Sequence, residues 1–336
     1  MQKNSMITRL IAAISGPNFG FGLIGSSLLL ASMAHSEAPQ PATAKILDSV
    51  RVSEVSPDGD EISELSGLAW DEDEQLLYAV SDSGFIIHFR IAIEGDKLAS
   101  VEPVLVAPLE EFEGNLLKFT WSLSNAESVL ARNSTNGKKS DTELVVALED
   151  GPVIARFTPQ GHFIKEIALP SPLGDPGAYS NDNKRLESVT ELPAHGIMTV
   201  PEAPLLGEPE DVHTIYAEDG AAWRFKAIQP YQSVIKDIEH LPDGRLLILE
   251  RTRDDSGGNS QAHLRLLDLK GCEAGSICPT TEVAVSNTEA LAADFEGLTR
   301  ISEDRFLMVT DEKASGNGGG EFLLLRLHVP RQINTD

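Results

Sequence analysis

The stretch at residues 293–312, ADFEGLTRISEDRFLMVTDE, carries the pattern that decides the fold. An acidic cluster opens it and another closes it. Between them a turn signal, SEDR, precedes an apolar run, FLMV. Short apolar runs joined by a turn are typical of a β-hairpin. The hairpin brings the carboxylates at its two ends close together, and like charges so close need something that offsets their repulsion.

The same pattern occurs five times along the chain, and almost no segment shows helical periodicity. Each copy has an acidic residue before a short apolar strand, then a turn, then a second apolar strand that ends in an acidic residue. The copies lie at residues 64–84, 125–151, 183–205, 234–253 and 293–312. Their first acids recur at intervals of roughly 50 to 63 residues, which fits one four-stranded propeller blade with its loops.

Each hairpin is followed by further β-rich segments. The expected third strands are FIIHFRIAI, PVIARFT, AAWRFKAI, AHLRLLDL and EFLLLRLHV, and the expected fourth strands are KLASVEPVLV, HFIKEIALP and TEVAVS in blades 1, 2 and 4. The fifth copy ends after its third strand, so the N-terminal segment KILDSVRV is free to supply the missing strand and close the ring. The sequence predicts an all-β protein with a single five-bladed propeller. Six blades is the alternative, if a degenerate copy lies in the long spacers.

The repeated acids are expected to converge, because the innermost strand of each blade lines the central channel of a propeller. The first acids are Glu64, Glu127, Glu187, Asp237 (or Glu239) and Glu296. The second acids are Asp82, Glu149, Glu202, Glu250 and Asp311. Carboxylates gathered at one channel mouth repel one another unless a cation neutralises them. Calcium, which takes about six to eight oxygen ligands in irregular geometry, is the expected ion.

A local role for each acid remains an alternative. Each could cap a turn or pair with a nearby cation, and the candidate cations are Arg185, Lys236, Arg251 and Lys313. The same placement in five blades favours a shared site. His240 adjoins one acidic position and could act as an acid or base, although a structural role is more common for such a histidine.

The charge balance excludes two classes of partner. The chain has 336 residues with 27 basic and 52 acidic side chains, which gives a formal net charge of −25. A surface this acidic repels phosphate backbones and anionic lipid headgroups, so we expect no nucleic-acid partner and no membrane-surface binding. Simple solubility is the alternative explanation of the acidity.

The N-terminus has the pattern of a targeting segment. A basic stretch, MQKNSMITR, precedes an apolar stretch, FGFGLIGSSLLLASMA, and small residues suited to cleavage follow. We expect a signal peptide at 1–38, a spacer at 39–44, the propeller domain at 45–330 and a tail at 331–336. An uncleaved anchor is the alternative. After cleavage we expect no stable membrane insertion, and the exported protein would be periplasmic or secreted.

Export permits a disulfide bond. The two cysteines, Cys272 and Cys278, lie in the loop sequence GCEAGSICP, and we expect them to bond in an oxidising compartment. Half of a zinc site is the alternative, but no second cysteine pair or histidine pair flanks them.

With these motifs in place, the chain resembles the secreted "esterase-like activity of phytase" (phytase-like) domain family. The matching motifs are Leu65-Ser66-Gly67-Leu68, Tyr78-Ala79-Val80-Ser81-Asp82, Ala126-Glu127-Ser128-Val129, Leu186-Glu187-Ser188-Val189, Pro201-Glu202-Ala203-Pro204-Leu205, Asp237, Leu241-Pro242-Asp243-Gly244-Arg245, Leu249-Glu250-Arg251, Phe295-Glu296-Gly297-Leu298 and Thr310-Asp311. They follow one another in the family's order over nearly the whole mature chain.

The resemblance implies hydrolysis of phosphate esters with calcium. This chain departs from a convincing phytase because a hexaphosphate needs a basic cradle and the expected mouth is acidic. The nearby cations that could contact a phosphate are Lys184, Arg185, Arg251 and Lys313.

Three hypotheses therefore remain. The chain is a calcium-dependent hydrolase of a small phosphate ester or other ester, a non-catalytic propeller that binds a ligand or envelope partner, or a propeller in which calcium only holds the blades together. Propellers host all three roles, so the fold alone cannot decide among them. We expect a monomer.

Overall fold

The computed structural model describes residues 41–110, 125–181, 183–229, 232–254, 259–311 and 319–330. The chain divides into two units, Met1–Ala38 and Pro39–Asp336, and only the second contains described residues. The expected signal peptide and the tail at 331–336 therefore lie outside the described residues. Within the described ranges, no helix is long and apolar enough to cross a membrane.

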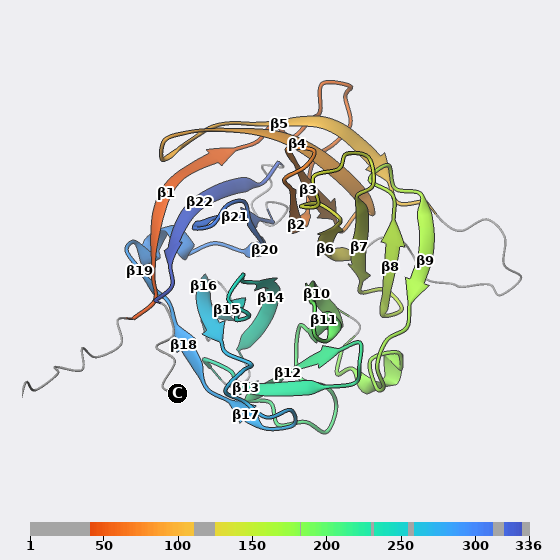
Figure 1. The fold of residues 1–336 in the computed structure, drawn as a ribbon, viewed down its shortest axis with the longest axis vertical. Helices are drawn as coiled ribbons and strands as arrows, with labels where there is room; N and C mark the ends of the chain where they lie inside the picture. The colour runs from red at the N-terminus through yellow and green to blue at the C-terminus, as the bar shows by residue number, and fades with distance from the viewer. Residues whose placement is uncertain are drawn as a thin grey trace, which may run out of the picture. The chain divides into compact units, whose positions relative to one another are not determined.

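Five β-sheets surround a common centre, as Figure 1 shows, and the expected all-β propeller with five blades is confirmed. Blade 1 contains β2 (Leu65–Asp71), β3 (Leu76–Ser81), β4 (Phe85–Glu94) and β5 (Lys97–Pro108). Blade 2 contains β6 (Ala126–Arg132), β7 (Glu143–Leu148), β8 (Val153–Phe157) and β9 (Phe163–Ile167). Blade 3 contains β10 (Leu186–Leu192), β11 (Gly196–Pro201), β12 (Val212–Ala217), β13 (Ala222–Lys226) and β17 (Ile277–Cys278).

The last two blades complete the ring. Blade 4 contains β14 (Ser233–His240), β15 (Leu246–Arg253), β16 (Ser260–Leu267) and β18 (Thr280–Glu282). Blade 5 contains β20 (Phe295–Arg300), β21 (Arg305–Thr310), β22 (Glu321–His328), β1 (Thr43–Arg51) and β19 (Ala284–Val285). The two short 3-10 helices among the described residues are η1 (Pro176–Ala178) and η2 (Thr288–Leu291).

The two ends of the domain close the ring, as the sequence predicts. Strand β1 pairs antiparallel with β22, from Thr43 opposite His328 to Arg51 opposite Glu321. The last blade thus takes its outer strand from the beginning of the domain. This pairing covers the edge that β22 would otherwise expose.

Five hydrophobic clusters, one between each pair of neighbouring blades, form the core. Between blades 4 and 5, for example, Leu247 and Leu249 share a cluster with Phe306 and Met308. Since the middle strands are buried on both faces, their sequences are continuously apolar and do not alternate. The FLMV run of β21 is buried throughout for this reason.

The strand assignment differs from the expectation in two places. In blade 3 the third strand is β12, and the segment AAWRFKAI that we expected there forms the outer strand β13. The sequence of β12, VHTIYA, contains His and Thr although the strand is buried on both faces. These polar residues are the reason that the sequence pattern did not identify it as a middle strand. In blade 4 the segment TEVAVS divides between β18, which pairs with β16, and β19, which pairs with β1.

The expected disulfide between Cys272 and Cys278 is present, with a Cα–Cα distance of 5.6 Å. It closes the loop that leads into β17, where Cys278 lies opposite Phe225 of β13. The loop therefore lies against the outer edge of blade 3 and covers part of it.

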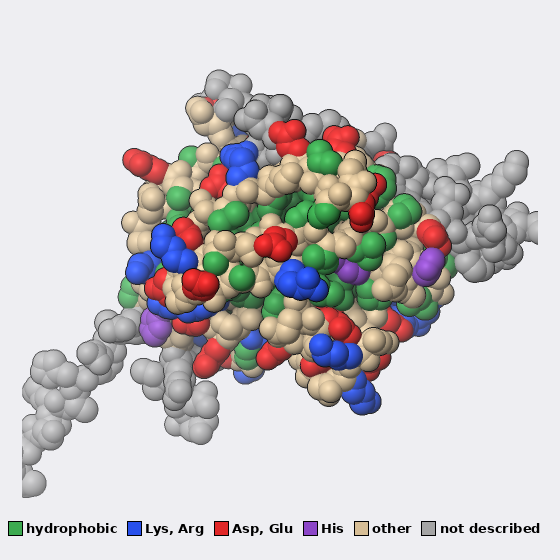
Figure 2. Space-filling view, turned by 90° about the horizontal axis from the view of Figure 1, so that it is seen from above, with side chains coloured by type: hydrophobic (Ala, Val, Ile, Leu, Met, Phe, Trp, Pro, Cys, Tyr) green, Lys and Arg blue, Asp and Glu red, His purple; other side chains and the backbone are tan. Residues whose placement is uncertain are grey.

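The side of the ring seen in Figure 2 mixes acidic, basic and hydrophobic side chains. Single Lys and Arg residues stand among the acids on this side. The net negative charge is therefore not spread as one uniform acidic face here. A denser group of acids lines a cavity inside the ring.

Candidate functional site

The inner strand of every blade contains a β-bulge at the same position. The pairing with the second strand shifts between Leu65 and Gly67 in blade 1, and the other four inner strands shift at the matching place. The bulge residues are Ser66, Glu127, Glu187, Lys236 and Glu296. A bulge interrupts the alternation of side chains along the strand and changes the direction of the extra residue. All five bulge side chains line the same cavity.

A second set of equivalent residues follows the neighbouring strand. In each inner strand, the residue just before the bulge has a partner on the second strand, and the residue after that partner is Asp82, Glu149, Glu202, Arg251 and Asp311 in blades 1 to 5. Backbone N–H groups fix this turn, as when Glu202 N donates to Arg185 O at 2.7 Å and Asp311 N donates to Asp294 O at 2.9 Å. Each blade thus contributes two side chains to one end of the ring.

All of these ten residues except Arg251 line a polar cavity of about 170 Å³ at that end of the central channel. The lining residues are Ser66, Asp82, Asn125, Glu127, Glu149, Asn183, Glu187, Glu202, Lys236, Glu296 and Asp311. Seven of them are carboxylates, and they come from four blades. Blade 4 is the exception, because Lys236 and Arg251 stand where the other blades have acids or Ser66.

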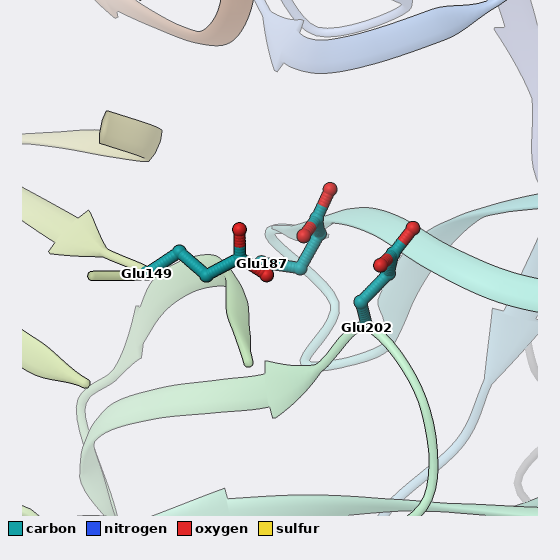
Figure 3. A group of neighbouring side chains, drawn as sticks. All are labelled: Glu149, Glu187 and Glu202. Atoms are coloured by element: carbon teal, nitrogen blue, oxygen red, sulfur yellow. The ribbon is translucent and has the colours of Figure 1, made fainter. Parts of the chain in front are cut away.

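Three of these carboxylates form a cluster suited to a cation. Glu149, Glu187 and Glu202 are all buried, and each offers one oxygen atom within 4.8 Å of the others. Figure 3 shows the three carboxylates side by side. Carboxylate oxygens in irregular arrangements are the ligands that calcium takes in proteins. The donor set therefore fits a hard divalent cation.

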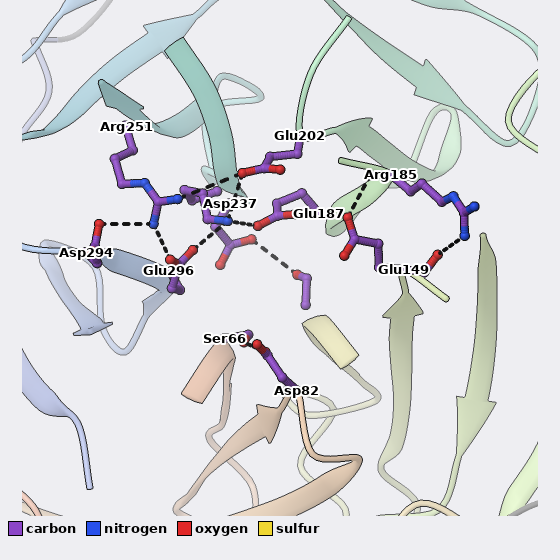
Figure 4. A network of polar contacts seen from close by, with 12 residues as sticks. Ser66, Asp82, Glu149, Arg185, Glu187, Glu202, Asp237, Arg251, Asp294 and Glu296 are labelled. Carbon is purple, nitrogen blue, oxygen red and sulfur yellow. Dashed lines mark hydrogen bonds and ion pairs between the residues drawn. The ribbon is translucent and has the colours of Figure 1, made fainter. Parts of the chain in front are cut away.

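The Lys236 ammonium group lies among the same acids. It donates to Glu187 Oε1, lies 2.7 Å from Glu296 Oε2 and lies 3.4 Å from Glu202 Oε1. Only 7% of its side chain is exposed, so these contacts are well shielded from water. Figure 4 shows Glu187, Glu202 and Glu296 turned toward one another, with Ser66 and Asp82 on the other side of the group.

Two arginines contact acids at the edge of the cluster. Arg251 donates to Glu296 Oε1, and its guanidinium lies 3.5 Å from Asp294 Oδ1 and 3.9 Å from Glu202 Oε1. Arg185 holds Glu149 through its backbone, since Arg185 N donates to Glu149 Oε1 at 2.8 Å. The Asn125 amide donates to Glu149 Oε2 at 3.2 Å. These contacts orient Glu149 toward the cavity.

Burial makes ionisation of the cavity acids costly. It raises the pKa of Glu149 to about 7 and the pKa of Asp82 to about 6, although Arg185 N and Ser66 Oγ lower them in part. Burial also raises the pKa values of Glu127 and Glu187 well above their ordinary range. A site with such acids favours either bound protons or a bound cation.

Several predicted site residues lie elsewhere. Glu64 is outside the cavity lining and accepts a hydrogen bond from Ser83 Oγ at 2.6 Å. Asp237 follows the bulge and points into the core, where it accepts from Leu298 N at 2.8 Å and Ile238 N at 2.9 Å. Glu250 is fully buried and forms an ion pair with Arg265.

The other predicted residues are also distributed over the fold. Glu239 lines a separate cavity of about 110 Å³, and burial raises its pKa to about 8. His240, opposite Leu246, ends β14 at the far end of the blade, away from the carboxylate cluster. Lys184 lines a neighbouring groove of about 340 Å³. Lys313 lies outside the described residues.

Residue-by-residue reasoning missed Ser66 and Lys236 as members of the ring. The signal that identifies them is the apolar–X–small–apolar frame of the inner strand. Leu65-Ser66-Gly67-Leu68 and Phe295-Glu296-Gly297-Leu298 share it, and Ile235-Lys236-Asp237-Ile238 fits it with Asp in the small position. Aligning the copies on this frame, and not on their acids, gives the observed register.

Comparison with solved structures gives chains of low similarity. A gluconolactonase, XC5397 from Xanthomonas campestris, is 14% identical with a TM-score of 0.35, covering 87% of this chain and 99% of that one. The endo-arabinase from Bacteroides thetaiotaomicron is 14% identical with a TM-score of 0.46, covering 84% and 99%. The Dos1 propeller is 11% identical with a TM-score of 0.36, covering 83% and 73%. Similarities of this size carry no functional information.

The sequence comparisons are more decisive. No curated protein is significantly similar to the chain in sequence. The family model described as "Phytase-like: Esterase-like activity of phytase" matches residues 60–314, which include all five inner hairpins and every residue of the cavity lining. The chain therefore belongs to the phytase-like family, whose description is esterase-like activity of phytase.

Proposed function

We propose that the chain is an exported hydrolase of small esters, phosphate esters first among them, that works with calcium held by Glu149, Glu187 and Glu202. The observation that carries the proposal is the buried three-carboxylate cluster inside a polar cavity of a phytase-like propeller. When bound there, a divalent cation polarises a phosphoryl or carbonyl oxygen and lowers the pKa of a water molecule.

The cavity also contains side chains suited to proton transfer. Asp82 lines it with a pKa raised to about 6, so its carboxylate can accept a proton from water close to neutral pH. Glu127 lines the same cavity, and burial raises its pKa well above the ordinary range, so it holds a proton more readily than an exposed glutamate and is the candidate donor to a leaving oxygen. The pair supplies a base and an acid at one site.

Blade 4 gives the cavity a positive side. Lys236 and Arg251 lie within reach of the cluster, and both are in contact with Glu202 and Glu296. An anionic ester that lies between the cation site and these two residues would have its charge partly neutralised. This asymmetry favours a singly anchored phosphate ester over a highly phosphorylated one, for which the acidic walls are unsuitable.

The proposal is tested by hydrolysis of p-nitrophenyl phosphate, p-nitrophenyl acetate and phytate, each with calcium and with chelator. We expect calcium-dependent turnover of at least one of them. Glu187→Gln should lower that turnover by about a hundredfold or more, since even indirect partners of a metal site contribute roughly 10- to 100-fold. Glu166→Gln, on the exposed face of β9, is the matched control and should retain full activity.

A non-catalytic role is the second candidate, and one observation favours it. Lys236 of blade 4 bridges Glu187 of blade 3 and Glu296 of blade 5, so the charged cluster also ties three blades together. If none of the three substrates turns over while calcium still raises the melting temperature, the site serves binding or stability and the hydrolase proposal is wrong.

A further inference from the structure

The position of Lys236 in the ring is unusual. At the equivalent bulge, the other blades carry Ser66 or a glutamate, and only blade 4 carries a cation. Its ammonium reaches across to the acids of two other blades, where it contacts Glu187, Glu202 and Glu296. The carboxylates at the centre of the site are therefore already in contact with a positive charge, the Lys236 ammonium group.

Two of these three partners belong to the cluster that fits a divalent ion. Glu187 Oε1 accepts directly from Lys236, and Glu202 Oε1 lies 3.4 Å from it, whereas Glu149 makes its contacts with Asn125 and Arg185. Calcium binds carboxylate oxygens at about 2.3–2.6 Å. An ion this close to Glu187 and Glu202 would lie against the ammonium group, and the two positive charges repel each other.

Glu296 provides Lys236 with an alternative partner. Its Oε2 lies 2.7 Å from the Lys236 Nζ atom, and Glu296 is outside the three-carboxylate cluster. The ammonium can therefore leave Glu187 and Glu202 and still keep one carboxylate partner in the same cavity. Arg251 holds Glu296 in place from the other side.

We propose that Lys236 is a tethered internal cation that competes with calcium for Glu187 and Glu202, so that the site accepts a divalent ion only by displacing this side chain toward Glu296. The proposal rests on the proposed metal site. It adds that the affinity of the site is set by a residue that does not bind the metal.

The contacts of Lys236 support the competition. Its ammonium group lies against the carboxylates of Glu187, Glu202 and Glu296 and is shielded from water, so it neutralises the same oxygen atoms that a divalent ion would need. A ligand whose competent site is populated only part of the time binds more weakly by that fraction. If the lysine occupies the cluster for about 90 to 99% of the time, it weakens calcium binding by roughly 10- to 100-fold.

The test is the dissociation constant for calcium, measured by isothermal titration of the chelator-treated protein. Lys236→Met removes the charge and keeps most of the side-chain volume, and it should bind calcium at least about tenfold more tightly than the unaltered chain. Lys165→Met is the matched control, because Lys165 is an exposed residue of β9 and its loss should leave the affinity unchanged. Equal affinities for Lys236→Met and the unaltered chain would overturn the competition and leave the metal site standing.

A paired variant keeps the test valid if the loss of one buried charge harms folding. Lys236→Met combined with Glu296→Gln removes the lysine together with the partner that lies outside the cluster, so fewer carboxylates are left uncompensated. It should show the same tighter binding. Absence of calcium binding in all of these proteins would overturn both this inference and the metal site of the proposed function.

Discussion

Raising the pH of the metal-free protein from about 5 to about 8 should lower its free energy of unfolding. The reason is that burial raises the pKa of Glu149 from 4.5 to about 7 and that of Asp82 from 3.8 to about 6. Between the unfolded and folded pKa values, the folded state binds more protons than the unfolded chain. The free energy of unfolding therefore falls as pH rises through this window, which is the reverse of the behaviour of salt-bridged carboxylates.

The size of the effect follows from the two shifts. One pKa unit corresponds to about 1.4 kcal/mol. Between pH 5 and its folded pKa of about 7, Glu149 costs the fold about 3 kcal/mol. Asp82, with a folded pKa of about 6, adds about 1 kcal/mol over the same range. From these two groups we expect a loss of about 4 kcal/mol, most of it between pH 5 and 7, and the buried Glu239, whose pKa is raised to about 8, adds to the loss in the same direction.

The assay is urea unfolding followed by tryptophan fluorescence at several pH values, in chelator and in millimolar calcium. Calcium should flatten the dependence on pH, because a bound cation favours the charged carboxylates. Glu149→Gln should remove the part of the pH dependence that Glu149 contributes in chelator, about 3 kcal/mol, and Glu166→Gln, an exposed acid on β9, should not change the dependence. A free energy of unfolding that stays constant or increases from pH 5 to 8 in chelator would refute the reasoning.

Two further predictions concern the ring itself. Gly67→Ala should lower the free energy of unfolding by about 1 to 3 kcal/mol, because a Cβ at that position would lie 2.6 Å from Ser128 Cα of the next blade. Gly174→Ala, where a Cβ meets nothing within 4 Å, is its control, and equal urea midpoints for the two variants would contradict the close approach of blades 1 and 2. A chain that begins at residue 53 lacks β1 and should lose cooperative unfolding, whereas one that begins at residue 41 should keep it. Matching transitions in circular dichroism would show that the pairing of β1 with β22 is dispensable.

The sequence predicts the architecture well because the hairpin pattern is long, repeated and local. FLMV in β21 and VVAL in β7 are recognisable as doubly buried strands without knowledge of their neighbours. Strand β12 was missed because VHTIYA mixes polar residues into a fully buried strand. Its burial depends on the two blades that pack around it, and the local sequence pattern does not predict this packing.

The candidate site was less predictable, because a shift of one residue moves a side chain to the other face of a strand. Matching acids to acids selected Asp237 and Glu250 in blade 4. The bulge register instead turns Lys236 to the cavity and Arg251 toward Glu202 and Glu296, and it directs Asp237 and Glu250 into buried positions with polar partners. The repeat predicts which residues face the cavity, but only when the copies are aligned on their apolar residues and not on their acids.

The pairing of β1 with β22 has a consequence for how the chain reaches its native state. These strands stand at opposite ends of the domain, yet they lie side by side in one sheet. Blade 5 cannot be completed, and the clusters on both of its faces cannot be sealed, before the final strand has been synthesised. Contacts between residues this distant in sequence slow folding and leave incomplete chains with unpaired strand edges. A nascent or truncated chain should therefore depend on chaperones until its last strand has emerged.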